Sequence, residues 1–181
     1  MRQKGFTLVE LAIVLVIIGI ILGAVIKGQD LIANAQAKRF TNELRKWEVV
    51  LWTYYDRHHK FPKNKSKLGG LANQLQNPIE IGGTDIYFGF GSSNGKEYLV
   101  ACKDSGCSAI TSDYLIFIFR TTDIAIDGNE NATDGLVQCI SDGSIDTSSW
   151  NATATAGSCS WNSTTHGLIY YLSSQNFDDE D

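Results

Sequence analysis

The sequence predicts an α+β fold in which one long N-terminal helix packs on a small antiparallel β-sheet. Two observations support this prediction. Apolar residues of the N-terminal third recur at intervals of three and four, as they do on one face of a helix. The remaining two thirds contain short β-branched or aromatic runs that are bounded by Gly, Asn, Asp and Ser. A length of 181 residues suits one globular domain beyond the N-terminal segment.

Charges divide the chain into two parts of opposite sign. Residues 1–67 carry 12 Lys and Arg against 5 Asp and Glu, whereas residues 68–181 carry 3 against 15. The two parts therefore have net charges of +7 and −12, which the modest total of −5 conceals.

The N-terminal segment, residues 6–26, is apolar almost throughout and has about the 20 residues that a helix needs to cross a bilayer. Arg2 and Lys4 precede it and place the N-terminus in the cytoplasm by the positive-inside rule. A cleaved secretory signal has its small-residue cleavage site after the apolar stretch, but here Gly5 comes before it. A signal anchor explains everything except Glu10, because burying a carboxylate in lipid costs about 2.5–3.5 kcal/mol.

The stretch Lys4-Gly5-Phe6-Thr7-Leu8-Val9-Glu10 resembles the class III signal of type IV pilins and of the pseudopilins of type II secretion. That signal is a short basic leader followed by Gly, Phe and then a Glu five residues into the mature chain. The resemblance implies that a prepilin peptidase cuts between Gly5 and Phe6 and then methylates the new amino group of Phe6. Residues 1–5 would then be the leader peptide, and the apolar segment would be retained.

The resemblance also implies a pilin fold and an assembly role for Glu10. A buried charge is tolerated when it is paired and costly when it is alone, so Glu10 would favour docking against the Phe6 ammonium of a neighbouring subunit. The implied function is that of a structural subunit, not an enzyme, in a type IV pilus, which is a homo-oligomeric helical filament. The implied partners are the prepilin peptidase, the assembly platform with its ATPase-driven machinery, and the inner membrane before assembly.

Two other functions remain open. One is a type II secretion pseudopilin, whose filament would stay in the periplasm rather than become an extracellular pilus. The other is a signal-anchored periplasmic sensor or enzyme. The sequence shows no catalytic arrangement, since His166 is far in sequence from any Cys or Ser with a supporting acid. The sequence therefore favours a filament subunit.

The first helix is predicted from about Thr7 to about Asp56. It ends before Phe61-Pro62, because the residue before a proline avoids helical geometry. Up to residue 26 it is apolar all round, whereas residues 27–56, which begin the globular domain 27–181, show a single apolar face. That face is predicted to contain Ile32, Gln36, Phe40, Leu44, Trp47, Leu51, Tyr54 and His58.

Residues 57–84 are predicted to be a loop between helix and sheet, with a short amphipathic helix at Ser66–Gln76. Five cations, with Phe61 among them, lie between Arg57 and Lys67. Such a cluster could bind nucleic acid. The favoured alternative is a solvated loop that complements the acidic half of a neighbouring subunit.

Residues 85–181 are predicted to form the sheet and a C-terminal disulfide loop, and the stretch Ser141–Thr165 is predicted to be an exposed loop. The sequence Ser92-Ser93-Asn94-Gly95 indicates a hairpin turn. The run from Tyr114 to Phe119 lacks alternation and is assigned to a buried central strand, with a helix as the less favoured alternative. The predicted strands are Asp85–Gly91, Lys96–Cys102, Tyr114–Arg120, Gly135–Ile140 and Gly167–Leu172.

Four cysteines occur, all in the predicted sheet region. A domain exported beyond the inner membrane meets an oxidising compartment, so disulfides are expected, and four cysteines allow three pairings. Proximity along the chain favours Cys102 with Cys107 and Cys139 with Cys159. By resemblance, the second pair closes a loop of the kind found in many pilins, and such a loop contributes about 3 kcal/mol. The Cys-x2-Cys spacing of zinc sites is missing.

One acidic segment has the spacing of a calcium loop. Its oxygen side chains at alternate positions could converge on Ca²⁺ as they do in an EF-hand. The match is partial, because Ala132 stands at the glycine position and Gln138 at the bidentate glutamate position. A plain turn is the alternative. The candidate ligands are Asp127, Asn129, Asn131 and Asp134.

Overall fold

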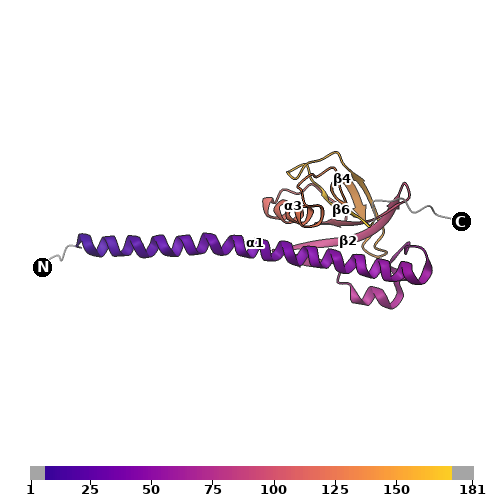
Figure 1. Cartoon of the computed structure of the whole chain (residues 1–181), viewed down its shortest axis with the longest axis horizontal. Coiled ribbons are helices and arrows are strands. Elements are labelled where there is room, and N and C mark those ends of the chain that lie inside the picture. Colours follow the sequence, from indigo (N-terminus) through magenta and orange to yellow (C-terminus); the bar gives the residue numbers. More distant parts are fainter. Residues whose placement is uncertain (1–6, 173–181) are drawn as a thin grey trace. The chain divides into compact units, whose positions relative to one another are not determined.

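The computed structural model describes residues 7–172 and divides into two compact units, Met1–Ala35 and Gln36–Asp181. Helix α1, Leu8–His58, runs through both (Figure 1). Its ends lie within two residues of the predicted ones. The described part of the first unit consists of Thr7 and helix α1 up to Ala35.

Within the second unit, one face of α1 is buried against the sheet. The ring of Phe40 stacks on Phe88 with centroids 5.9 Å apart, and Trp47 stacks on the same Phe88 ring at 5.3 Å. Large aromatic side chains bury much apolar area at such a contact, which makes it a major source of stability. Ile32 and His58, which were predicted on this face, are exposed instead. The buried residues of α1 are Ala37, Phe40, Leu44, Trp47, Val50, Leu51 and Tyr54.

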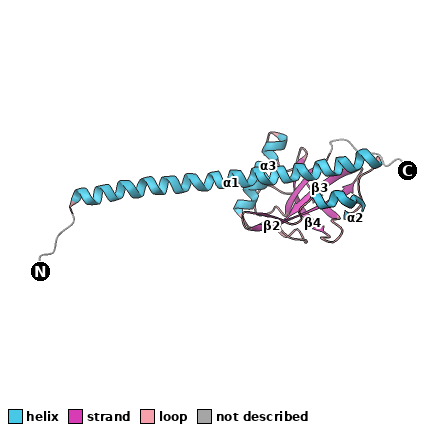
Figure 2. Ribbon diagram, turned by 90° about the horizontal axis from the view of Figure 1, so that it is seen from below, coloured by secondary structure: helices cyan, strands magenta, loops and turns pink. Residues whose placement is uncertain are grey.

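The sheet has six strands in the order β1-β2-β3-β6-β4-β5, and all neighbouring strands are antiparallel. Helix α1 runs along one face of this sheet (Figure 2). The predicted α+β arrangement of one long helix on an antiparallel sheet is thus confirmed. Residues Asn94 and Gly95 form the turn between β2 and β3, and both have positive φ, as a two-residue hairpin turn requires. The strands are β1 Ile79–Ile81, β2 Thr84–Ser93, β3 Lys96–Cys102, β4 Val137–Ile145, β5 Ala152–Ala156 and β6 Gly167–Tyr171.

The β4–β5 hairpin, at one end of the strand order, bends back over the sheet face opposite α1 and contacts β2. The Phe90 amide donates to the Trp150 carbonyl at 2.9 Å, and the Tyr98 hydroxyl donates to the Ala152 carbonyl at 3.2 Å. Gly89 permits this approach, because a Cβ there would lie 2.9 Å from the Cβ of Ala152. The prediction of an exposed loop over residues 141–165 is therefore wrong for residues 141–145 and 150–156, whereas the other residues form turns and irregular chain. This region contains the end of β4, all of β5 and the buried ring of Trp150.

Helix α3, Asp113–Asp127, replaces the predicted strand Tyr114–Arg120. An apolar run without alternation is compatible with a helix or a buried strand. The aromatic and β-branched residues in this run favoured the strand prediction, which is wrong. The tertiary context decides the outcome, since Phe119 packs on Phe40 with centroids 5.1 Å apart. The helix ends at Gly128, which caps it in the left-handed conformation with a φ of 78°.

The predicted helix Ser66–Gln76 is divided into two short elements. Helix α2, Lys65–Leu68, is followed by the 3-10 helix η1, Gly69–Gln74. Gly69 has a φ of +54°, which a continuous helix does not allow, and it separates the two. The side chain of Asn77 then holds the chain against β2 through hydrogen bonds to both backbone groups of Phe88.

Both disulfides link the pairs that sequence proximity favoured. Cys102 is bonded to Cys107, and Cys139 is bonded to Cys159. The second bond joins β4 to the segment that follows β5, so it fastens the folded-over hairpin to the sheet. No free cysteine remains among the residues described.

Candidate functional site

The first candidate site is the surface of α1 before residue 27, where apolar side chains are exposed on every side. Leu8 is 87% exposed and Leu15 is 68% exposed. Helix α1 contains a window long and apolar enough to cross a membrane, and none of that window is buried in the described chain. A core helix of a soluble protein would be buried, so this surface fits membrane anchoring or packing against other chains.

Glu10 lies in the first turn of this helix and is hydrogen-bonded to Thr7. The Thr7 amide and the Thr7 hydroxyl both donate to Glu10 Oε2 at 2.8 Å, while the Glu10 amide donates to Thr7 Oγ1 at 3.2 Å. This reciprocal arrangement is a capping box, which satisfies backbone donors that a helix start leaves open. The carboxylate therefore has a partner inside its own chain. The predicted cleavage and methylation residues, Gly5 and Phe6, lie outside the described residues.

Three glycines lie on the lower part of α1, at positions 19, 23 and 28. A Cβ built on any of them meets nothing within 4 Å. Their lack of side chains therefore serves no contact within the described chain. Small residues on a helix surface do allow close approach of another helix.

The basic segment, residues 57–67, is the second candidate site. Its five cations are all exposed, and none has an ion pair among residues 7–172. Lys65 lies over the Trp150 ring, with Nζ 4.5 Å from the centroid. The other four cations extend from the end of α1 into α2. The segment thus presents net positive charge to solvent.

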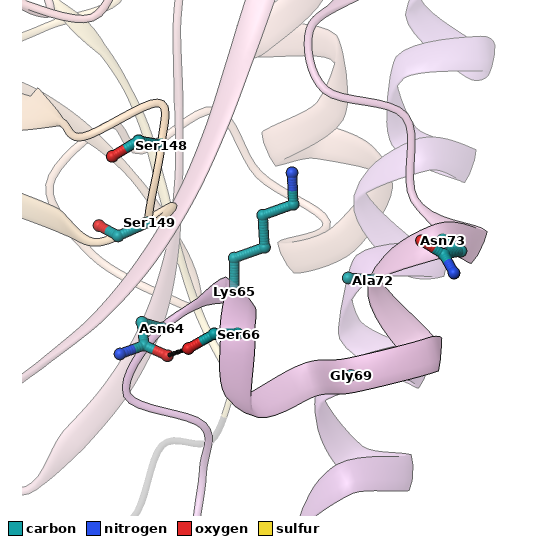
Figure 3. A pocket seen from close by; sticks show the side chains of 8 residues that line it. All are labelled: Asn64, Lys65, Ser66, Gly69, Ala72, Asn73, Ser148 and Ser149. Atoms are coloured by element: carbon teal, nitrogen blue, oxygen red, sulfur yellow. Dashed lines mark hydrogen bonds between the residues drawn. The ribbon is translucent and has the colours of Figure 1, made fainter.

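Beside α2 lies an open pocket of about 440 Å³ (Figure 3). Helix α2 lies on one side of it, and Ser148 and Ser149 lie on the other. Asn64 holds the start of α2 at the edge of the pocket, since its Oδ1 accepts hydrogen bonds from the Ser66 hydroxyl at 2.6 Å and the Lys67 amide at 3.2 Å. The lining includes no His, Cys, Asp or Glu, and the Lys65 ammonium lies over the Trp150 ring. The lining residues are Asn64, Lys65, Ser66, Gly69, Ala72, Asn73, Ser148 and Ser149.

Asp123 is a buried acidic residue that the sequence did not single out. It lies on α3, is fully buried, and accepts a hydrogen bond from Trp161 Nε1 at 2.9 Å, while its Oδ1 has no partner among the described atoms. Burial raises the pKa of Asp123, the Trp161 hydrogen bond lowers it and the nearby Asp127 carboxylate raises it, and the net result is a pKa of about 6. The local sequence does not predict this burial, because an isolated Asp in an apolar stretch can be either buried or exposed.

The predicted calcium loop is built from turns. Asp127 Oδ2 accepts from the Val137 amide at 2.8 Å, and Asn129 Oδ1 accepts from the Asn131 amide at 2.9 Å. Asn131 Oδ1 and Asp134 Oδ1 likewise accept from backbone amides. Within residues 7–172, no group of three or more His, Cys, Asp or Glu side chains is placed to hold a metal ion. Calcium binding stays a prediction, and the described hydrogen bonds fit the plain-turn alternative.

His166 does not take part in a catalytic arrangement among the described residues. Its Nδ1 lies 2.8 Å from the Cys107 carbonyl oxygen, which fixes the ring beside the first disulfide. This contact gives His166 a packing role.

Comparisons with known proteins bear on the first candidate site. A family model described as "Prokaryotic N-terminal methylation motif" matches residues 1–26. Two proteins of Neisseria gonorrhoeae, each named "Type IV major pilin protein PilE1", are 37% identical to the chain over 68 residues. The match covers 37% of this chain and 41% or 38% of the relatives, so the chain spans about two fifths of their length. No solved structure matches significantly. The predicted resemblance to type IV pilins is thus confirmed.

Proposed function

We propose that the chain is a structural subunit of a type IV pilus, cut after Gly5, N-methylated at Phe6 and polymerised through its N-terminal helix. The observation that carries this proposal is the methylation motif over residues 1–26, which contains the part of helix α1 whose apolar side chains are exposed. The similarity to two major pilins supports the same function. In this proposal the inner membrane covers the apolar surface before assembly, and sister helices cover it in the filament.

Mass spectrometry of the native N-terminus tests the processing step. Purified mature subunit is expected to begin at N-methyl-Phe6, because the peptidase removes the five-residue leader. A chain that still begins at Met1 in a strain with an active prepilin peptidase would refute the proposal. It would favour the signal-anchored alternative.

Electron microscopy of cells that produce the full chain tests polymerisation. Glu10→Gln keeps an oxygen that can accept from Thr7 but removes the charge, whereas Thr7→Val keeps the charge and removes the hydroxyl donor. If a neighbour's Phe6 ammonium binds Glu10, the Glu10→Gln variant is expected to yield at least tenfold fewer filaments. Thr7→Val is the matched control and is expected to lose less. Equal yields from Glu10→Gln and the unmodified chain, at equal membrane levels, would contradict charge pairing.

A further inference from the structure

Two patches of opposite sign lie on the unit Gln36–Asp181. The basic tip consists of Arg57, Lys60 and Lys63, which lie in and just after the last turn of α1 and are all exposed. The acidic edge consists of Glu80 and Asp85 on the β1–β2 hairpin, together with Asp113 at the start of α3. None of these six side chains has an ion pair among the described residues.

Strand pairing and one ring contact bring the three residues of the acidic edge together. Glu80 and Asp85 are register partners across the hairpin. They share its exposed face, since the alternate residues Ile79 and Ile81 are buried. The Tyr114 ring lies against the Gly82 backbone at the hairpin turn, and Asp113 immediately precedes that ring.

The pairing of Glu80 with Asp85 lowers the stability of an isolated subunit, because like charges directly opposite on a sheet repel. Strand β1 lies at an edge of the sheet, and charged residues on an edge do prevent wrong pairing with other strands. A Lys opposite a Glu, however, would prevent wrong pairing equally well, so this role does not explain two carboxylates opposite each other. A cation brought by a partner would turn this local repulsion into attraction.

The two patches lie at different ends of the unit. Helix α3 packs on α1 near Thr41, whose hydroxyl is 3.0 Å from that of Thr122. From Thr41 to the end of α1 at His58, the helix rises about 25 Å at 1.5 Å per residue. Figure 1 shows α3 and the last turn of α1 at opposite ends of this unit. Patches at different ends make a heterologous contact, which produces an open polymer when it does not close.

We propose that the basic tip of one copy binds the acidic edge of another copy of the same chain. This inference rests on the proposed filament function and names a contact within it. The contact supplies cations to the repelling carboxylates and fixes which surfaces of successive globular units meet. It is exposed, so salt weakens it, since the Debye length falls from about 8 Å at 0.15 M to about 3 Å at 1 M.

Charge reversal with complementation tests this contact in cells that assemble the full chain. Lys60→Glu with Lys63→Glu, and separately Glu80→Lys with Asp85→Lys, are each expected to lower the sheared filament fraction at least fivefold. A chain that carries all four substitutions is expected to return to within twofold of the unmodified chain, because the charges are then exchanged. Recovery in the fourfold variant also shows that the substituted chains fold.

A matched control places the same charge change elsewhere on the unit. Glu130 and Asp142 are exposed and lie outside the acidic edge and the candidate calcium ligands, and their replacement by Lys is expected to leave filament yield within twofold. Equal loss in this control, or failure of the fourfold variant to recover, would overturn the inference.

Two further outcomes separate this inference from the function on which it rests. Filaments that are insensitive to both reversals would overturn the contact alone and leave the filament function intact. If Lys60→Glu with Lys63→Glu lowered only DNA binding by normal filaments, the basic tip would be a nucleic-acid surface and the inference would be wrong. A lack of filaments from the unmodified chain would overturn the filament function and the contact together.

Discussion

Replacing Asp123 by Asn is expected to stabilise the second unit at neutral pH and to change its pH dependence. The Asp123 side chain is fully buried, and its pKa is raised from 3.8 to about 6. Between these two values the folded state holds a proton on Asp123 that the unfolded state has released. The unfolding free energy therefore falls as pH rises from about 4 to about 6.

The magnitude follows from the size of the pKa shift. One pKa unit corresponds to about 1.4 kcal/mol, so the ionised carboxyl lowers the unfolding free energy by about 2–3 kcal/mol above pH 7. Asn at position 123 keeps an oxygen acceptor for Trp161 Nε1 and offers an amide donor toward Asp127, without any charge. The gain from Asp123→Asn is expected to be small at pH 4 and about 2–3 kcal/mol at pH 8.

Urea unfolding of the detergent-solubilised full chain measures this difference, with the disulfides intact and tryptophan fluorescence as the signal. The assay compares Asp123→Asn with the unmodified chain at pH 4, 5, 6, 7 and 8. Thr121→Ser, in the same helix but at a partly exposed position, is a control that should show no pH-dependent difference. A gain from Asp123→Asn that is the same at all five pH values would refute the assignment of a buried, protonated carboxyl.

Three further predictions concern the packing of the second unit. Gly89→Val is expected to destabilise it by about 1–3 kcal/mol, because the new side chain overlaps the β4–β5 hairpin. Gly70→Val is the control in calorimetry, since a Cβ at Gly70 meets nothing within 4 Å. Phe40→Ala is expected to cost about 3–5 kcal/mol in urea unfolding, as it empties the helix–sheet contact. Replacing Cys139 and Cys159 by Ser is expected to cost about 3 kcal/mol at constant pH, and an unchanged unfolding midpoint would contradict the entropic account of the 20-residue loop.

Elements with a local signal were predictable from the sequence. Helix α1 has a 3.6-residue apolar period over its upper half, and β2 and β3 flank an Asn-Gly turn. Those elements lie within two residues of their predicted ends. Helix α3 was missed because its apolar run has no clear period, so its contact with α1 had to decide between helix and strand.

Strand β5 was missed for a different reason. Its surroundings are rich in Ser, Thr and Asn, a composition typical of exposed loops. Its burial depends on Gly89 and Gly91, which lie about 60 residues earlier in the sequence. Because these residues have no side chains, the backbone of Trp150 and Ala152 can approach them closely. A long-range fit of this kind leaves no local pattern. The burial of Asp123 under Trp161 has the same origin, since the two residues meet through tertiary packing.

Thr7 changes how the charge of Glu10 is understood. The sequence presented Glu10 as a lone carboxylate in an apolar run, yet Thr7 and Glu10 also have the spacing of a capping box. The described hydrogen bonds from Thr7 use Oε2, whereas Oε1 has no described partner among residues 7–172. One oxygen can thus close the helix start within the subunit while the other receives a neighbour's ammonium. Under the proposed function, docking would add a second partner to a carboxylate that its own chain already orients, and no large rearrangement of Glu10 would be needed.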